Sequence, residues 1–286
     1  MPQVVGALIA GVLVGPSVLN WVGETDFLVK AAELGVIILM FNAGMDTDLE
    51  ELKKTRDDCG TLLMTLDDLE DADWENNWKQ YYKPMEIGDR LLVVPEWLRE
   101  DPKVRAGLAA GRVALVLDPG LTFGTGSHAT TRLCLTALEK TIRGGERVLD
   151  LGCGSGILSI AALKLGAASA AAVDIDDKCR DVAYENAALN GIGQDTYTVR
   201  IGDVLGDAVL RADLGGGWQM VVANIVADVI IGLSPLVRPM LAPGGLFLCS
   251  GIIDDRAQEV ADRLRENGWE ILETRSAEGW FSYLCR

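Results

Sequence analysis

The sequence predicts an α/β fold with a seven-stranded, doubly wound and mostly parallel sheet that carries helices on both faces. Two observations predict it. Strand-like apolar runs alternate regularly with helical segments over residues 116–286, and the run that begins at 147 ends in a glycine-rich turn followed by a helix. Such alternation is typical of parallel sheets, because parallel strands need crossover connections that cover the faces. No helical segment separates the last two runs, so we expect them to pair as an antiparallel hairpin.

The individual elements follow from apolar runs that are punctuated by glycines. We expect strands at 147–152, 170–175, 196–202, 220–226, 244–251, 269–275 and 280–285. We expect helices near 156–166, 178–190, 227–241 and 255–267, with one more beginning near Thr130.

Composition narrows the function classes. The net charge is −16 and the sequence shows no basic stripe, so we expect no direct binding of nucleic acid. The six cysteines are scattered without a C-x-x-C pair, which favours buried free thiols in a reducing, cytoplasmic compartment. A single histidine excludes a multi-histidine metal centre, and we expect no metal.

Residues 57–115 are predicted to form a linker region that contains a helix and a strand. Four aromatic side chains fall at helical spacing and predict one apolar face, which favours packing over a binding cage: Trp74, Trp78, Tyr81 and Tyr82. The strand is expected within RLLVVP, residues 90–95.

Residues 1–56 form a third, apolar region. The run at 4–22 is nearly free of charge and about long enough to cross a bilayer, and a second run at 27–45 carries Lys30 and Glu33. The stretches LIAGVLVGPSVLNWV and AAELGVIILMFNAGMDTDL resemble the opening helices of Kef-like monovalent cation:proton antiporters. The resemblance implies an apolar helical segment and membrane association through residues 1–56. It stops near residue 54, so we do not expect transport.

The glycine-rich turn in LDLGCGSG predicts a nucleoside site. Gly152, Cys153 and Gly154 are expected beneath the ligand, because glycines allow a tight turn and a close backbone approach. Asp174 ends the next strand, where a carboxylate can hold ribose hydroxyls; the alternative is an N-cap for the helix near 178. The spacing is G-x-G-x-G, which favours S-adenosylmethionine (SAM) over a dinucleotide. The predicted sheet is also the usual architecture of SAM-dependent methyltransferases.

Two further strand ends contribute candidate residues. Asp203 is placed to receive the adenine amino group or to serve as a simple turn residue. Asn224 ends a strand beside the expected sulfonium, where its amide offers both a donor and an acceptor to a substrate amine. Asn224 is therefore a candidate for both cofactor binding and catalysis.

A second glycine-rich stretch, LDPGLTFGTGSHATT at 117–131, precedes a helix. Its backbone N–H groups could meet an anionic group such as the SAM carboxylate, and the alternative is an N-capped loop before a packing helix. His128 is a candidate proton acceptor in this stretch, although a lone histidine is more often structural.

The motifs DPGLTFGTGSHATTRLCL, VLDLGCGSGILSIAALKLGA, VDID and ANI resemble the PrmA family, from about Leu62 to the C-terminus. The resemblance implies SAM contacts at Thr131, Gly152, Asp174 and Asn224. It also implies methylation of lysine ε-amino and N-terminal α-amino groups of ribosomal protein L11. Members of that family begin with a small α+β domain that binds this substrate, and residues 1–56 stand in its place here.

Other readings stay open. The residues Asn224-Ile225-Val226-Ala227 lack the N-P-P-Y pattern of enzymes that methylate planar amides and bases, which favours an aliphatic amine. That amine could belong to another protein or to a small molecule, or the chain could be a non-functional fusion with a membrane-like segment.

Overall fold

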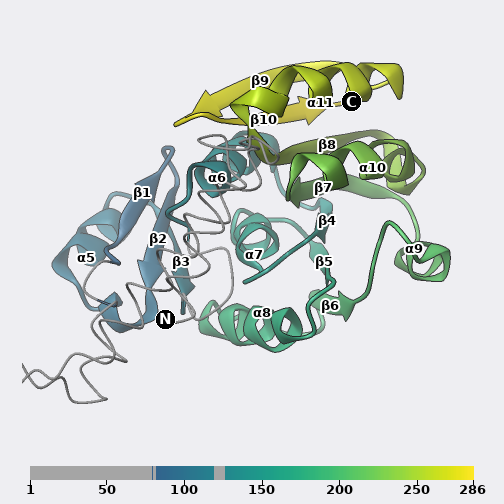
Figure 1. Cartoon of the computed structure of the whole chain (residues 1–286). Helices are drawn as coiled ribbons and strands as arrows, with labels where there is room; N and C mark the ends of the chain where they lie inside the picture. Colours follow the sequence, from purple (N-terminus) through teal and green to yellow (C-terminus); the bar gives the residue numbers. More distant parts are fainter. Residues whose placement is uncertain (1–78, 80–81, 119–125) are drawn as a thin grey trace, which may run out of the picture. The chain divides into compact units, whose positions relative to one another are not determined.

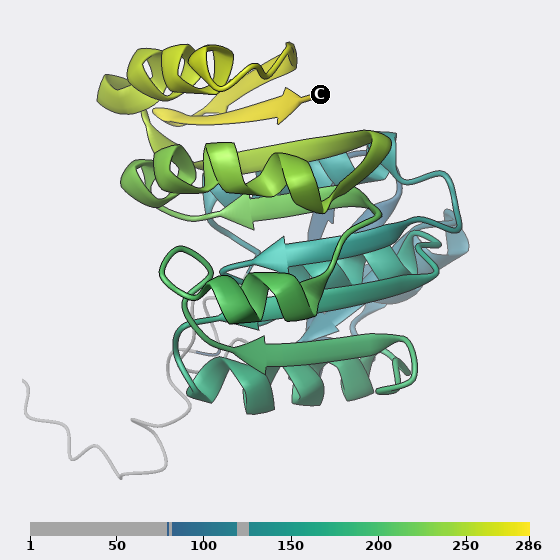
Figure 2. The same ribbon diagram turned by 90° about the vertical axis from the view of Figure 1, so that its right-hand side faces the viewer.

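A seven-stranded sheet in the order β6-β5-β4-β7-β8-β10-β9 forms the centre of the computed structural model, which describes residues 79, 82–118 and 126–286 (Figures 1 and 2). Five of its strands are parallel: β4 (Arg147–Leu151), β5 (Ser169–Asp174), β6 (Tyr197–Ile201), β7 (Trp218–Asn224) and β8 (Leu241–Ile253). The last two, β9 (Ile271–Ala277) and β10 (Trp280–Cys285), form the expected hairpin, with β10 antiparallel to β8. The predicted fold class and all seven strands are confirmed.

Helices cover both faces of the sheet, so both faces are buried. Alternate residues of each strand point to opposite faces. On β4, Val148 joins a core cluster with three helices: α6 (Ala129–Thr141), α7 (Ile157–Lys164) and α8 (Lys178–Leu189). The next residue, Leu149, joins a second cluster with α9 (Ala208–Leu214), α10 (Ala227–Val237) and α11 (Asp254–Glu266). Figure 2 shows α10 in front of the strands and the α6 and α7 side behind them. The molecule therefore has a doubly wound, three-layer core.

One helix ends earlier than expected, and one short helix was not expected. The helix expected over 227–241 ends at Val237 and continues as the 3-10 helix η3 (Arg238–Met240), because Pro239 has no N–H with which to continue the helix. The short helix α9 was missed. The side chain of Asp207 caps it by accepting the N–H groups of Val209 and Leu210, which is a recognisable N-cap signal.

Residues 82–115, which we expected to belong to a linker region with one strand, contribute to a second sheet. Strands β1 (Met85–Ile87), β2 (Leu91–Pro95) and β3 (Val113–Leu117) pair in that order, β1 antiparallel and β3 parallel to β2. The 3-10 helix η2 (Glu96–Leu98) and α5 (Pro102–Ala109) connect β2 to β3. The expected division between residues 57–115 and 116–286 falls inside β3. This strand packs apolar residues into the main core, so it belongs with the residues that follow it.

Several expectations fall on residues outside the described ranges. These are the apolar runs at 4–22 and 27–45, together with Trp74, Trp78 and Tyr81 of the aromatic face. Tyr82 is described, and its ring packs edge-on against Trp97 with 6.4 Å between centroids. Within the described ranges, no helix combines the length and the apolar character that crossing a membrane requires.

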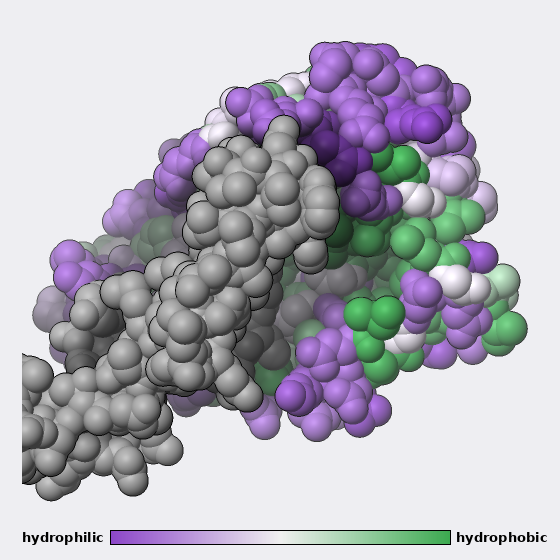
Figure 3. Space-filling view, viewed as in Figure 1, coloured by the Kyte–Doolittle hydropathy of each residue, from purple (hydrophilic) through white to green (hydrophobic). Residues whose placement is uncertain are grey.

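The polarity of the α11 surface and the burial of the cysteines agree with the sequence. The outward face of α11 is hydrophilic, as its sequence DDRAQEVADRLRE requires (Figure 3). The five cysteines of the described residues are buried and free, as expected of structural thiols.

The buried carboxylate of Glu139 attaches the small sheet to α6. Its two oxygens accept the backbone N–H groups of Asp89 and Arg90, at 2.9 and 3.0 Å, in the turn between β1 and β2. Gly88 in this turn has a φ of +52°, and a Cβ there would lie 2.5 Å from the carboxylate. The turn therefore closes onto Glu139 only with glycine at position 88.

Replacing Glu139 with alanine should leave two backbone N–H groups without their acceptor and lower the free energy of unfolding by about 2–3 kcal/mol. Urea denaturation of the full chain measures this loss. Glu270→Ala is the control, because Glu270 pairs with Arg286 at the surface and should contribute less than about 1 kcal/mol. Equal losses in the two variants would contradict the role of Glu139 as an anchor.

Candidate functional site

A cavity of about 740 Å³ lies at the carboxyl ends of β4, β5 and β7. The chain runs from β4 through β5 to β6 on one side and places β7 on the other side of β4, so the cavity lies where the strand order reverses. Open α/β sheets bind their ligands at such a point. Seven predicted residues line the cavity: Thr131, Gly152, Cys153, Gly154, Asp174, Asp203 and Asn224.

The glycine turn between β4 and α7 needs glycine for two reasons. Gly152, Gly154 and Gly156 have φ values of +74°, +51° and +77°, which residues with a Cβ rarely adopt. A Cβ on Gly152 would also lie 2.5 Å from Cγ2 of Ile225. The missing side chain of Gly152 leaves room for the side chain of Ile225, the residue that follows Asn224. The sequence analysis did not predict this contact.

Ile225 is enclosed on its other side by β8. Its backbone N–H donates to the carbonyl of Ser250 at 3.0 Å. Gly251, with a φ of +88°, lies so close that a Cβ there would collide with the backbone of Ile225. Two glycines therefore hold the turn that presents Asn224 to the cavity.

Asp174 at the end of β5 is fixed by two backbone groups. Its Oδ2 accepts the N–H of Gly154 at 2.8 Å, and its Oδ1 accepts the N–H of Asp176 at 3.1 Å. The alternative role as the N-cap of α8 is not observed, because Asp177 occupies that position and Asp176 accepts the N–H of Lys178. Each oxygen of Asp174 keeps a further lone pair for a ligand hydroxyl.

Asn224 and Thr131 form the opposite part of the wall. The amide Nδ2 of Asn224 donates to the hydroxyl of Thr131 at 3.4 Å, and Thr131 is completely buried. The Oδ1 of Asn224 is buried and accepts no hydrogen bond from the described residues. A buried acceptor without a donor is costly, so this cavity suits a ligand or substrate that carries an N–H or O–H group at that point.

Asp203 and His128 behave differently from the other candidates. The exposed Asp203 lines the cavity and also accepts the N–H of Leu205 at 2.9 Å, so it is a turn residue as well. His128 caps α6, with its Nδ1 2.8 Å from the Thr130 hydroxyl and its ring edge-on to Trp280. It is not among the residues that line the cavity. Residues 119–125 of the second glycine-rich stretch lie outside the described residues.

The sequence analysis missed the buried carboxyl of Asp150 on β4. Its Oδ2 accepts the N–H of Ser159 at 3.1 Å, and its Oδ1 has no partner among the described residues. The pKa of Asp150 is raised to about 7, mainly because the carboxyl is buried; hydrogen bonds from Ser159 oppose this rise, and the nearby charge of Asp174 adds to it. An aspartate inside the apolar run VLDL is the signal that could have identified it.

The rest of the cavity wall is mostly apolar, which suits a ligand with an aromatic base. Ile175, which directly follows Asp174, lines the cavity and is 73% exposed. Other lining side chains that the sequence analysis did not single out are Leu151, Leu158, Val173, Leu205, Ile225 and Val229. The described residues hold no group of three or more His, Cys, Asp or Glu side chains that could bind a metal ion.

Comparisons with known proteins agree with this geometry. The family model described as ribosomal protein L11 methyltransferase (PrmA) matches residues 24–286. A ribosomal protein L11 methyltransferase of Caldanaerobacter subterraneus subsp. tengcongensis is 41% identical over 236 residues, which cover 82% of this chain and 72% of the relative. The crystal structure of a ribosomal protein L11 methylase from Lactobacillus delbrueckii subsp. bulgaricus is 34% identical, with a TM-score of 0.63 over 72% of this chain and 98% of that chain.

A more distant structure supports the fold alone. It is a methyltransferase crystallised with S-adenosylhomocysteine, 10% identical with a TM-score of 0.50, over 75% of this chain and 78% of that chain.

The match corrects the expectation for the N-terminal region. It begins at residue 24 and includes the second apolar run at 27–45, whereas we expected the PrmA resemblance to begin near Leu62. The resemblance of residues 1–56 to Kef-like antiporters is not supported.

Asp174→Ala should weaken SAM binding by about 1.5–3 kcal/mol, because hydrogen bonds to the charged carboxylate are lost. Isothermal titration of the full chain with SAM measures this. Asp176→Ala removes the same charge from the same cavity and should bind SAM nearly as the wild type does. An unchanged affinity in Asp174→Ala, with the fold intact by circular dichroism, would remove Asp174 from the cofactor site.

Asp150 should make the free energy of unfolding depend on pH. Its folded pKa lies above the unfolded value of 3.8, so its contribution to stability decreases as the pH rises toward and through about 7. Asp150→Asn removes this titration. Relative to the wild type, the variant should gain about 2 kcal/mol between about pH 5 and about pH 8 in urea denaturation. A parallel pH dependence of the two proteins would contradict the buried, titrating carboxyl.

Proposed function

This chain belongs to the ribosomal protein L11 methyltransferase (PrmA) family, and we propose on that premise that it transfers methyl groups to ribosomal protein L11. The chain is a SAM-dependent methyltransferase. The observation that supports the proposal best is the cavity, which brings seven predicted residues together around the Oδ1 of Asn224, an atom without a hydrogen-bond partner among the described residues. We propose that the protein works in the cytoplasm.

The acceptor groups proposed here are lysine ε-amino groups and the N-terminal α-amino group. The turn that follows Asn224 contains Ile225 and Val226, without an aromatic side chain to stack on a planar amide. Val226 is 64% exposed beside the site, which suits the aliphatic stem of a lysine. An apolar surrounding also favours the neutral amine, which is the nucleophilic form, because it disfavours the ammonium.

The cavity residues divide into cofactor and acceptor roles. SAM, when bound, supplies an electrophilic methyl group on a sulfonium. We assign the ribose to Asp174 and the adenine side to Asp203. Gly152, Cys153 and Gly154 would hold the methionine and ribose portions. Thr131 orients the amide of Asn224 through its hydroxyl.

We assign to Asn224 the orientation of the acceptor amine. Its buried Oδ1 can accept an N–H of the neutral amine and align its lone pair with the methyl group. Alignment of this kind supplies much of the acceleration in a transfer between two bound reactants. His128 caps α6, and we assign no proton transfer to it.

The proposal is tested with the purified full chain, labelled SAM and recombinant ribosomal protein L11. We expect label on lysine and N-terminal amino groups of that protein, located by mass spectrometry. Free lysine and an unrelated basic protein serve as competing acceptors. Stronger labelling of either would favour the alternative of another protein or a small amine. An absence of transfer to all acceptors would favour the non-functional alternative.

In the same assay, Asn224→Ala should lower turnover about a hundredfold, because the amine loses its orientation. SAM affinity, measured by titration, should fall much less. Asn190→Ala, which removes an asparagine remote from the cavity, is the control. Equal losses of turnover and affinity in Asn224→Ala would make Asn224 a cofactor residue, and wild-type turnover would exclude it from the site.

A further inference from the structure

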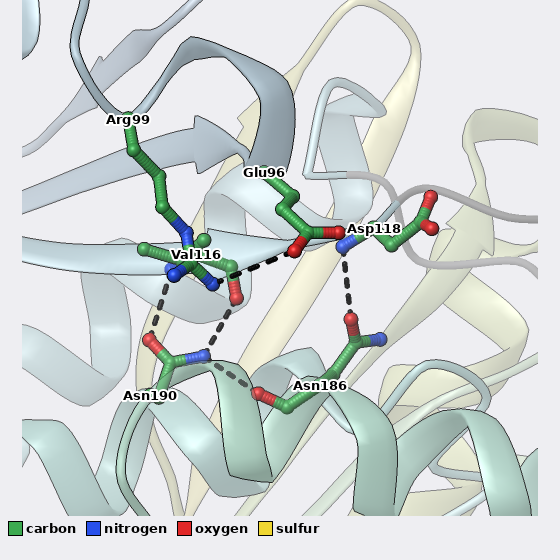
Figure 4. Close-up of polar contacts among 6 residues, drawn as sticks. All are labelled: Glu96, Arg99, Val116, Asp118, Asn186 and Asn190. Carbon is green, nitrogen blue, oxygen red and sulfur yellow. Dashed lines mark hydrogen bonds and ion pairs between the residues drawn. The ribbon is translucent and has the colours of Figure 1, made fainter.

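Two asparagines, Asn186 in the last turn of α8 and Asn190 at its C-cap, bind the end of strand β3 (Figure 4). Asn190 accepts the N–H of Val116 at 2.9 Å and donates its Nδ2 to the carbonyl of Val116 at 2.6 Å. Asn186 accepts the N–H of Asp118 at 2.9 Å through its Oδ1. Because β3 is an edge strand, these amides take the place of a neighbouring strand and satisfy its backbone groups.

Asn186 has a second partner that Asn190 lacks. Its Nδ2 donates to the carbonyl of Ser155 at 3.0 Å, in the glycine turn that lines the cofactor cavity. The side chain of Asn186 is buried, with the residue 1% exposed. One amide therefore links the end of β3 to the cofactor turn.

The turn needs such support, because its glycines lose more backbone freedom on ordering than other residues do. Gly154 and Gly156 both have positive φ values, so the intervening Ser155 is held between two residues of high backbone freedom. Asp174 fixes the N–H of Gly154, and Asn186 fixes the carbonyl of Ser155. Two side chains thus fix the N–H at the start and the carbonyl at the end of the dipeptide Gly154-Ser155. Of these two side chains, Asp174 lines the cavity and Asn186 does not.

We propose that Asn186 is a positioning residue for methyl transfer: by holding the Ser155 carbonyl, it preorganises the cofactor turn for SAM. The inference rests on the SAM dependence of the chain and not on the identity of its protein substrate. Without the amide, the turn samples other conformations, and SAM binding must restrict them at a cost in affinity.

Asn190 supplies a matched control. It is the same residue type, four residues further along at the C-cap of α8, and it also makes hydrogen bonds to β3. It makes no described contact with the cofactor turn. Asn186→Ala and Asn190→Ala should therefore both lower the free energy of unfolding, but only Asn186→Ala should weaken SAM binding.

The test is isothermal titration of the full chain with SAM, accompanied by urea denaturation of each variant. We expect the Kd for SAM to rise about tenfold in Asn186→Ala, the effect of losing one buried hydrogen bond, and to stay at the wild-type value in Asn190→Ala. Unchanged affinity in Asn186→Ala would overturn the proposal. Equal weakening in both variants would overturn it too, since the effect would then follow stability alone.

Asn186→Asp distinguishes the accepting Oδ1 of the amide from its donating Nδ2. It remains informative if the alanine variant does not fold. It keeps an oxygen that accepts the Asp118 N–H but has no N–H to donate to Ser155. We expect SAM binding to weaken as in Asn186→Ala, despite the added negative charge near a cationic cofactor. Wild-type affinity in Asn186→Asp would overturn the proposal. The titrations need no acceptor, so a failure to methylate ribosomal protein L11 would affect only the proposed substrate.

Discussion

The hydrogen bond from the Gly154 N–H to the carboxylate of Asp174 is the contact on which the cofactor cavity depends. It joins the turn after β4 to the end of β5, its neighbouring parallel strand. The same contact orients the carboxylate that we assign to the ribose. The turn then meets Ile225 from β7 at Gly152, so all three strand ends share one packed arrangement. The position of Asn224 follows from this arrangement.

The main sheet could be predicted because each strand is a short apolar run with a glycine boundary, and because parallel strands bring their carboxyl ends to one edge. That geometry predicts that Asp174, Asp203 and Asn224 share one cavity, as they do. The small sheet was harder to predict. Its strand β3 follows the short helix α5, whose start is marked only by Asp101 and Pro102. The regular alternation of strands and helices is recognisable in the sequence only from residue 116 onward.

Contacts between distant segments could not be predicted from local patterns. Asn186 bonds to residues 31 and 68 positions away, and its role is invisible in the helical run that contains it. Gly152 was correctly expected to allow a close approach, but the approaching group is Ile225 and not only a ligand. His128 shows the opposite case, in which a chemically suggestive residue in the sequence caps a helix. The antiporter resemblance rested on two short stretches of residues 1–56, whereas the family match extends from residue 24 to the C-terminus.

The enclosure of Ile225 limits how the acceptor preference of this enzyme could be redesigned. Introducing the Pro-Pro-Tyr sequence after Asn224 would place proline at position 225, where the backbone N–H now donates to Ser250. The new ring would also have to fit between Gly152 and Gly251, each of which leaves no more space than Ile225 fills. A change from aliphatic amines to planar amides therefore requires coordinated changes in three strands. The turn that presents Asn224 is fixed by residues of three strands, so a single substitution in this turn would not accommodate the Pro-Pro-Tyr sequence.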